Sequence, residues 1–275
     1  MSETNAMSED MSNDINDGIK DDMSETHALT PTAEQFGPEA RFAIYYAPPA
    51  ASDWWREGCR WLQRDPHTHA VLEAPSVPGL NGNLTELTRE PRRYGWHATL
   101  VAPFRAAPSV TPTQIHAHAL AWAARQQGFD VPVQVTQLDG FMAVVPASAG
   151  AADCADARVA VGALAADAVR ACAALRAPPT AAELERRRTM PLSARQEALM
   201  LAWGYPFVFE EFRFHMTLSN RVGPADARAI QAWWQTRLPA LGPLPFKGAA
   251  LFVQTAPQND FVLWQRLPFA QEAAL

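Results

Sequence analysis

Short apolar runs with the composition of β-strands recur along the chain after residue 40. Arg41–Pro48 (RFAIYYAP) is rich in aromatic and aliphatic residues and ends at prolines, which cannot continue a sheet ladder. Val131–Val145 contains two such runs on either side of Asp139-Gly140, a dipeptide that favours a hairpin turn. The other predicted strands are Tyr94–Arg105, Phe212–Val222, Phe246–Val253 and Phe261–Leu267.

Helical segments lie between these runs and carry start signals. Ser52 can cap a helix from Asp53 to about Arg64, whose tryptophans form its apolar side. Thr111 as the cap and Pro112 at the first helical position begin another, which Gly128 ends. Further helices are predicted at Asp153–Leu175, after Pro191 and from Pro224, whereas residues 65–92 predict a long loop because they are rich in Pro, Gly, Asn and Thr.

One order of elements occurs twice: a strand with the triplet His-x-Thr, a helix that begins at proline, and a hairpin. The corresponding histidines, His97 and His215, are 118 residues apart, a repeat too long for a solenoid. The pattern predicts an α+β fold with two similar lobes from an internal duplication. Each lobe would be an antiparallel sheet backed by helices, with a groove between the lobes. The predicted lobes are residues 39–150 and 151–275, forming one bilobal domain.

Composition limits the cellular setting. The chain has 275 residues, 48% of them hydrophobic, and no run of 18 uncharged apolar residues, so no membrane association is expected. The N-terminus is polar and acidic and does not resemble a signal peptide, and Cys59, Cys154 and Cys172 lack metal-type spacing. These features predict a cytoplasmic protein. Residues 1–38 predict a disordered acidic tail.

Charge separates this tail from the rest. Residues 1–40 hold ten acids and one Lys, whereas the remainder holds 22 basic and 19 acidic residues and is therefore about +3. A mildly basic body suits a small anionic substrate, because a protein that coats nucleic acid is usually more basic. The expected partner is a small phosphorylated substrate, with an RNA end as an alternative.

The two His-x-Thr triplets are the candidate chemistry. With 7 histidines and 16 threonines, chance predicts fewer than one such triplet, yet two occur, each preceded by an aromatic residue and followed by Leu. In a strand, His97 and Thr99 project to one face, as do His215 and Thr217. Two imidazoles can divide the work of general base and general acid at a phosphodiester, while hydroxyls bind its non-bridging oxygens. This chemistry requires neither a metal nor a cofactor, and none is predicted.

These paired motifs resemble the two-histidine (2H) phosphoesterase superfamily, which is named after two such motifs on facing strands. Within it, Arg41–Pro49, Glu90–Arg105 and Gln196–Val222 are similar to a branch of uncharacterised proteins associated with phosphonate degradation. The resemblance covers most of residues 40–268. It implies that His97, Thr99, His215 and Thr217 are catalytic, and that the substrate is a cyclic phosphate or an RNA end that carries one. The phosphonate association narrows this to a small ribosyl phosphate ester.

One position departs from the pattern. Relatives often have Lys after the Leu of the first motif, where this chain has Val101, expected on the His97 face. A basic phosphate contact is therefore expected either to be absent or to come from Arg105, Arg213 or Arg221. Tyr45 or Tyr46 is expected to border the groove.

The resulting prediction is a metal-independent phosphodiesterase for a cyclic or activated phosphate ester of a small sugar or nucleotide. Processing or ligation of RNA ends with 2′,3′-cyclic phosphates is the alternative enzyme. A protein that binds a phosphorylated ligand without turnover is the alternative outside enzymes. Metal binding by His67/His69 or His116/His118 is weighed lower, because no cysteine or carboxylate cluster accompanies either pair.

Overall fold

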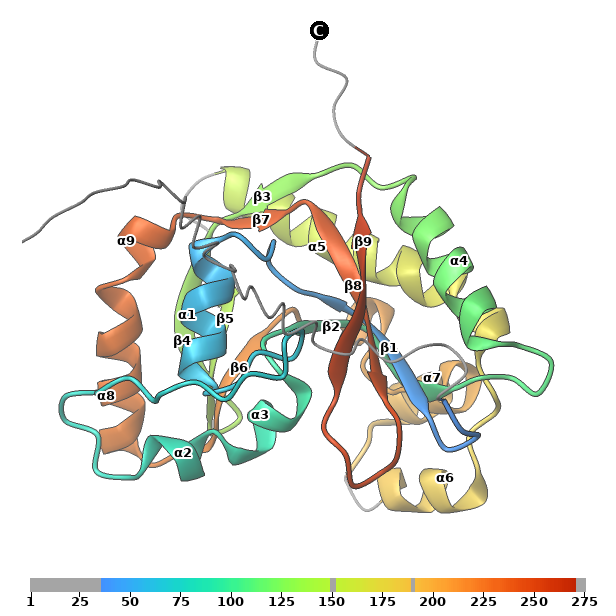
Figure 1. Cartoon of the computed structure of the whole chain (residues 1–275), viewed down its shortest axis with the longest axis horizontal. Helices are drawn as coiled ribbons and strands as arrows, with labels where there is room; N and C mark the ends of the chain where they lie inside the picture. The colour runs from blue at the N-terminus through green and yellow to red at the C-terminus, as the bar shows by residue number, and fades with distance from the viewer. Residues whose placement is uncertain (1–35, 149–151, 189–190, 271–275) are drawn as a thin grey trace, which may run out of the picture.

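The computed structural model describes residues 36–148, 152–188 and 191–270. Its strands are β1 Arg41–Tyr46, β2 Ala98–Arg105, β3 Phe129–Val131, β4 Val133–Leu138, β5 Phe141–Pro146, β6 Met216–Arg221, β7 Leu244–Phe246, β8 Gly248–Gln254 and β9 Val262–Pro268. Its α-helices are α1 Asp53–Trp61, α2 Leu84–Leu87, α3 Arg89–Tyr94, α4 Pro112–Ala123, α5 Ala152–Ala171, α6 Ala181–Arg188, α7 Ala194–Trp203, α8 Pro224–Gln235 and α9 Leu238–Leu241 (Figure 1). Short 3₁₀ helices cover Ala173–Leu175 and Phe209–Glu211.

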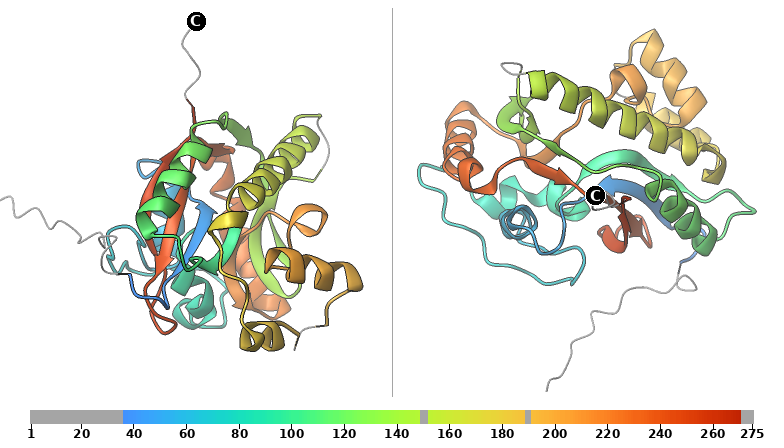
Figure 2. Two further views of the ribbon diagram at one scale, coloured as in Figure 1. Left: turned by 90° about the vertical axis from the view of Figure 1, so that its right-hand side faces the viewer. Right: turned by 90° about the horizontal axis from the view of Figure 1, so that it is seen from above.

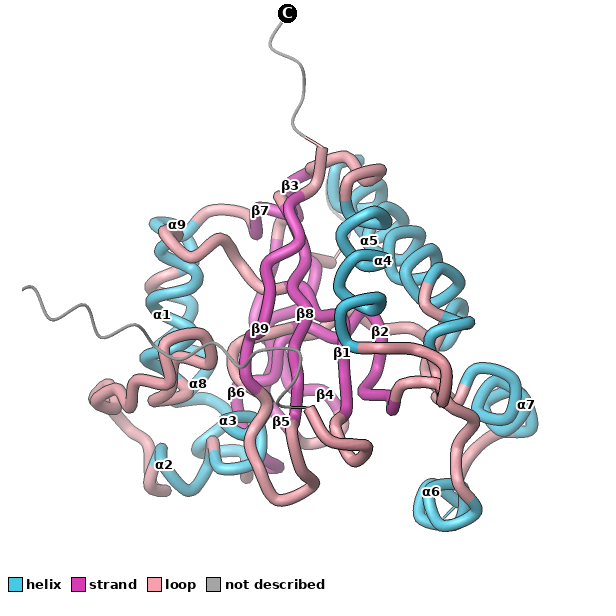
Figure 3. Tube along the Cα trace, turned by 45° about the vertical axis from the view of Figure 1, so that its right-hand side comes forward, coloured by secondary structure: helices cyan, strands magenta, loops and turns pink. Residues whose placement is uncertain are grey.

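Seven strands form an antiparallel sheet in the order β4-β5-β6-β2-β1-β8-β9, and β3 pairs with β7 beside it. Helices flank the sheet on both sides, and α6 and α7 lie to one side, away from the strands (Figures 2 and 3). The fold is therefore α+β with antiparallel pairing, as the sequence predicts. No helix of the described residues is both long and apolar enough to cross a membrane.

The sheet narrows at its middle. Among the described residues, β2 and β6 share a single pair of facing Cα atoms, Ala98 and Met216, whereas the other neighbouring strands pair over longer stretches. The β4-β5 hairpin pairs with β6, and β8-β9 pair with β1. Each side of the sheet thus combines strands from before and after residue 150, and the division into two lobes stays a prediction. The internal duplication stays a prediction.

Most elements begin where their residues favour them. The side chain of Ser52 accepts a hydrogen bond from the Trp55 amide at the start of α1, and Thr111 forms a capping box with Gln114 at the start of α4. The β4-β5 hairpin turns at Asp139 and Gly140, both with positive φ, as this type of turn requires. The predicted loop of residues 65–92 is partly wrong, because its end contains α2 and the start of α3.

Tryptophans form much of the core behind the sheet. Trp54, Trp61, Trp96, Trp233 and Trp234 contact one another across α1, α8 and the segment before β2. The indole Nε1 of Trp61 donates to the Leu218 carbonyl of β6 at 2.7 Å and so fixes α1 against that strand. Near the other edge, Phe36 packs edge-on against Trp264, with ring centroids 4.8 Å apart. Phe36 belongs to the predicted tail, whose residues 1–35 lie outside the described part of the chain.

Candidate active site

Both His-x-Thr motifs lie where the two parts of the sheet meet. The antiparallel pairing of Ala98 with Met216 joins β2 to β6, and each histidine lies directly before one of these two residues. The Nε2 of His97 lies within 3.5 Å of the hydroxyl of its own motif, Thr99. All four residues line one cavity of about 380 Å³.

The two histidines are oriented by the same device. The Nδ1 of His97 lies 2.9 Å from the Gly95 carbonyl, and the Nδ1 of His215 lies 2.8 Å from the Arg213 carbonyl. A carbonyl can only accept, so each Nδ1 carries a proton and each neutral ring presents an unprotonated Nε2. The Nε2 of His97 lies 3.5 Å from the Thr99 hydroxyl. Both rings are thus prepared to accept a proton, and each becomes a donor once it is charged.

Burial controls the charge of both rings. The pKa of His97 is lowered to about 4. Burial is the main cause and the nearby His215 also lowers the pKa, whereas the hydrogen bond to the Gly95 carbonyl favours the charged form and raises it. The pKa of His215 is also lowered, chiefly by burial and against its bond to Arg213. Both imidazoles are therefore mainly neutral at pH 7 in the unliganded protein. A bound phosphate anion raises both pKa values because it stabilises the charged rings.

Aromatic side chains form one wall of the cavity. Tyr45 is 1% exposed and stacks on His97 with ring centroids 3.9 Å apart, and Tyr94 stacks on Phe261 at 5.2 Å. Burial raises the pKa of Tyr45 well above its usual value, so its phenol stays neutral. Of the two tyrosines considered from the sequence, Tyr45 lines the cavity, and its ring fixes the plane of the His97 imidazole.

The predicted arginines do not lie in this cavity. Arg105 forms an ion pair with Glu183 at 3.2 Å and donates to the Pro178 carbonyl, and Arg221 is exposed near the β4-β5 turn. Arg213 lines a neighbouring cavity instead. Although burial alone would raise the pKa of the Glu183 carboxyl, hydrogen bonds from Thr180 and Arg105 lower it to about 2, so this pair is charged at neutral pH.

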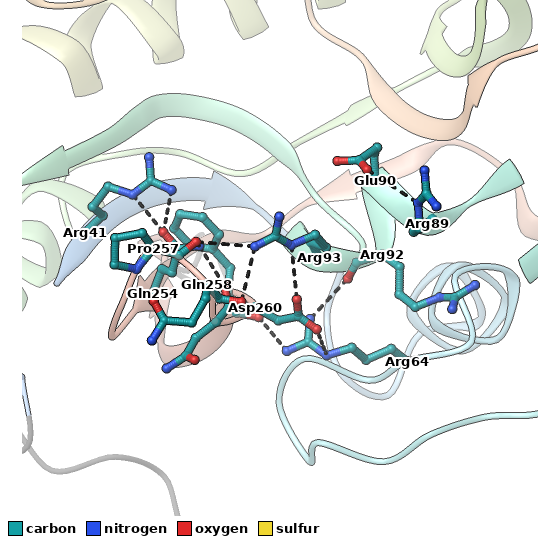
Figure 4. A network of polar contacts seen from close by, with 12 residues as sticks. Arg41, Arg64, Arg89, Glu90, Arg92, Arg93, Gln254, Pro257, Gln258 and Asp260 are labelled. Carbon is teal, nitrogen blue, oxygen red and sulfur yellow. Dashed lines mark hydrogen bonds and ion pairs between the residues drawn. The ribbon is translucent and has the colours of Figure 1, made fainter. Parts of the chain in front are cut away.

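Arg41 is the cation that the sequence analysis missed. Among the described residues that line the cavity, Arg41 is the sole Arg or Lys. Its Nε donates to the buried Gln254 side chain at 2.7 Å, and Gln254 in turn donates to the Pro257 and Asn259 carbonyls. Figure 4 shows the Arg41 guanidinium held beside Gln254 and the turn after β8. Alternation along the strand is the sequence signal that places Arg41 near the site, because residues 41 and 45 share a face of β1.

A β-bulge explains why Val101 is not in the site. Tyr45 of β1 faces Thr99, but the next residue of β1, Ile44, faces Val101, so β2 has an extra residue between these pairs. Side chains beyond a bulge change face, and Val101 is buried with Ile44 away from the cavity. The expectation that Val101 shares the His97 face is therefore wrong. Val101 is not among the residues that line the cavity.

The other histidines do not gather into a site. His116 packs against Trp264 with ring centroids 5.7 Å apart, while His118 binds the Ala171 carbonyl at 2.8 Å. His69 lines a separate polar cavity with Arg64 and Asp260. Among the described residues, no three His, Cys, Asp or Glu side chains lie close enough to hold one metal ion.

Comparisons with known proteins identify a family to which this chain belongs and solved structures that resemble it distantly. A protein family described as "Protein of unknown function (DUF1045)" matches residues 99–262. Two proteins named "Ribose 1,5-bisphosphate phosphokinase PhnN" are similar in sequence. The one from Janthinobacterium sp. (strain Marseille) is 37% identical over 84% of this chain and 51% of its own length. The one from Laribacter hongkongensis (strain HLHK9) is 36% identical over 78% of this chain and 48% of its own length. The chain thus spans about half the length of the curated relatives it matches.

Solved structures with a distant likeness include two of E. coli LigT. The complex with 3′-AMP has a TM-score of 0.34 and 12% identity, covering 85% of this chain and 99% of that one. The complex with NADP+ has a TM-score of 0.36 and 14% identity, covering 86% and 100%. A crystal structure described as a phosphoesterase has a TM-score of 0.35 and 14% identity, covering 84% and 99%.

Proposed function

Because the chain belongs to the DUF1045 family, whose description assigns no activity, and carries the paired motifs of the two-histidine phosphoesterases, we propose that it hydrolyses a phosphodiester without a metal ion. The substrate is a cyclic or activated phosphate ester of a small sugar or nucleotide, in phosphonate catabolism. The observation that carries this proposal is the convergence of His97, Thr99, His215 and Thr217 on one cavity of about 380 Å³. A volume of this size suits a small molecule.

The two imidazoles divide the proton transfers. Water attacks phosphorus while the Nε2 of His97 accepts its proton, and the bond to the leaving oxygen breaks as the Nε2 of His215 donates one. His97 is the base because its pKa of about 4 keeps it neutral. His215 is then the acid, because a bound phosphate anion favours its charged form against the burial that lowers its pKa.

The remaining groups hold the phosphate. The hydroxyls of Thr99 and Thr217 donate to its non-bridging oxygens, where charge develops in the transition state. Arg41 makes the cavity attractive to an anion, and Gln254 limits the directions in which its guanidinium can point. The described lining of this cavity has no carboxylate, the ligand type that Mg²⁺ and Ca²⁺ require.

The name of the longer relatives suggests a kinase, and the sequence argues against that activity here. A phosphate-binding loop ends in Gly-Lys followed by Ser or Thr, since its lysine contacts the nucleotide phosphates. This chain has two lysines, Lys20 after Ile19 and Lys247 before Gly248, and neither lies in such a motif. We assign the kinase activity of the relatives to the half that this chain does not match.

A panel of cyclic phosphate esters, assayed with and without EDTA, tests the proposal. We expect hydrolysis of at least one small cyclic phosphate at an unchanged rate in EDTA, because the imidazoles perform both proton transfers. His97→Ala and His215→Ala should each lower kcat about 10²–10⁴-fold, the usual contribution of a positioned acid or base. The double variant should lose less than the product of the two.

The alternatives give different results in the same assay. Turnover confined to RNA with a cyclic end would indicate RNA-end processing. Binding without turnover would indicate a ligand-binding protein. Loss of the rate in EDTA, or a His97→Ala variant with normal turnover, would contradict the two-histidine mechanism.

A further inference from the structure

A second cavity of about 510 Å³ adjoins the first and has no role in the mechanism above. Thr99 and His215 line both cavities, whereas His97 and Thr217 line only the first among the described residues. Tyr205 and Phe207, from the segment after α7, also border both and lie between them. The second cavity therefore opens beside the proposed acid and not beside the proposed base.

The two cavities differ in charge. Arg41 makes the first cavity cationic, as an anion requires. The second cavity is lined by Asp139, Glu211 and Arg213, two acids and one base, so it does not attract a second anion. The Glu211 carboxylate also accepts a hydrogen bond from Gln196 at 2.9 Å.

The second cavity offers apolar and aromatic surface. The Phe141 ring lies 5.6 Å from the His215 ring, centroid to centroid, and Phe207 and Leu138 also face the cavity. Rings and aliphatic side chains of this kind bind an uncharged, flat group by burying its surface. The Nδ1 of His215 remains on the Arg213 carbonyl, so its Nε2 is the nitrogen available to a group between the cavities.

We propose that the second cavity binds the leaving alcohol of an acyclic phosphodiester, and that this alcohol carries an uncharged aromatic or apolar ring. This inference rests on the proposed function. Water forms the new bond to phosphorus on the His97 side, and its proton passes to the Nε2 of His97. The bond from phosphorus to the leaving oxygen breaks toward the second cavity, and the Nε2 of His215 protonates that oxygen. The site then accepts linear diesters as well as cyclic ones.

Binding of phenyl phosphate and of inorganic phosphate, measured by calorimetry, tests the cavity without turnover. We expect phenyl phosphate to bind about tenfold more tightly, since burying a ring accounts for at least that ratio. Leu138→Trp fills the second cavity without touching the first and should abolish this preference. Leu120→Trp, the same change on the exposed face of α4, should retain it. Leu138→Phe adds a smaller ring to the second cavity and should reduce the preference for phenyl phosphate. This variant replaces Leu138→Trp if the Trp variant does not fold.

Turnover of two diesters then separates this inference from the proposed function. Leu138→Trp should lower kcat/KM for bis(p-nitrophenyl) phosphate about tenfold and leave hydrolysis of a small cyclic phosphate unchanged, because the cyclic leaving oxygen stays attached to the substrate. Failure of the wild-type protein to hydrolyse either diester would contradict the proposed function. Equal binding of phenyl and inorganic phosphate, or a preference that persists in Leu138→Trp, would overturn the inference alone.

Discussion

At the scale of single residues, burial lowers the pKa of both imidazoles of the site, and the mechanism gives them opposite roles. His97 must be neutral to act as a base, so kcat/KM falls as the pH drops below its pKa of about 4. His215 must be charged to act as an acid, so kcat/KM falls as the pH rises past its pKa, which burial holds below that of an ordinary histidine. We therefore expect a bell-shaped profile of kcat/KM with its maximum on the acid side of neutrality.

Single substitutions assign the two limbs of this profile. His97→Ala should remove the acidic limb, and His215→Ala should remove the alkaline one. The profile of kcat should lie at higher pH than that of kcat/KM, because the bound phosphate raises both pKa values. A maximum of kcat/KM above pH 7, measured in a series of buffers at constant ionic strength, would contradict the assignment.

Gly95 is a residue whose backbone positions His97. Its φ of 78° lies in the region that favours glycine, and a Cβ there would lie 2.7 Å from Pro66. Its carbonyl also accepts the Nδ1 proton of His97. We expect Gly95→Ala to lower kcat about tenfold or more, since small displacements of catalytic groups are costly. Gly37→Ala, where the added Cβ meets nothing within 4 Å, is the matched control and should keep full activity.

How far the site follows from the sequence depends on whether its geometry is local. The His-x-Thr spacing is local, and alternation along a strand is enough to place each histidine beside its threonine. The prediction that Val101 shares the His97 face is wrong because a β-bulge near Leu100 interrupts that alternation. No residue type in the motif indicates a bulge. Alternation along β1 places Arg41 on the face of Tyr45, but which face of β1 meets the cavity depends on its pairing with β2, which is not local.

At the scale of elements, α1 is fixed by a close approach between a helix and a ring. A Cβ added at Gly58 would lie 2.2 Å from the Trp96 indole, which is closer than two non-bonded carbon atoms approach in proteins. Gly58→Ala should therefore lower the free energy of unfolding by about 1–3 kcal/mol, the usual cost of overpacking a core. Because Trp96 precedes His97, we also expect activity to fall.

Gly162→Ala in α5 is the control for that experiment. An added Cβ meets nothing within 4 Å there, so alanine should raise the free energy of unfolding by up to about 1 kcal/mol through helix propensity. Urea unfolding followed by circular dichroism measures both variants. If Gly58→Ala were as stable as the wild-type protein, the contact between α1 and Trp96 would not be as close as described.

Elements with strong local signals were predicted well, and short ones were not. The capped starts of α1 and α4 and the turn at Asp139-Gly140 follow from side chains within a few residues. Helices α2 and α3 are too short to be stable alone and depend on distant partners. The Gln63 side chain donates to Thr88, and the Arg92 guanidinium donates to the Leu62 carbonyl. Composition cannot reveal such contacts, so this segment resembled a loop.

At the scale of the whole molecule, the two sides of the sheet exchange strands between the halves of the chain. The β4-β5 hairpin joins β6 across more than 70 residues, and β8 joins β1 across about 200. The apolar pattern identifies these strands but not which strands they pair with, because several strand edges present similar backbone hydrogen-bonding groups. The pairing of β2 with β6 makes the site a product of both halves, since the two His-x-Thr motifs lie at the starts of these strands.

The whole chain should lack the kinase activity in the name of its longer relatives. No Gly-Lys-Ser/Thr motif is present to hold the phosphates of ATP, and this chain matches about half of each relative. Incubation with ribose 1,5-bisphosphate, Mg²⁺ and ATP, followed by measurement of ADP, should give no more ADP than a control without the sugar phosphate. The full-length Janthinobacterium protein is the positive control. Formation of ADP that depends on the sugar phosphate and persists in the His97→Ala variant would place a kinase site in this chain.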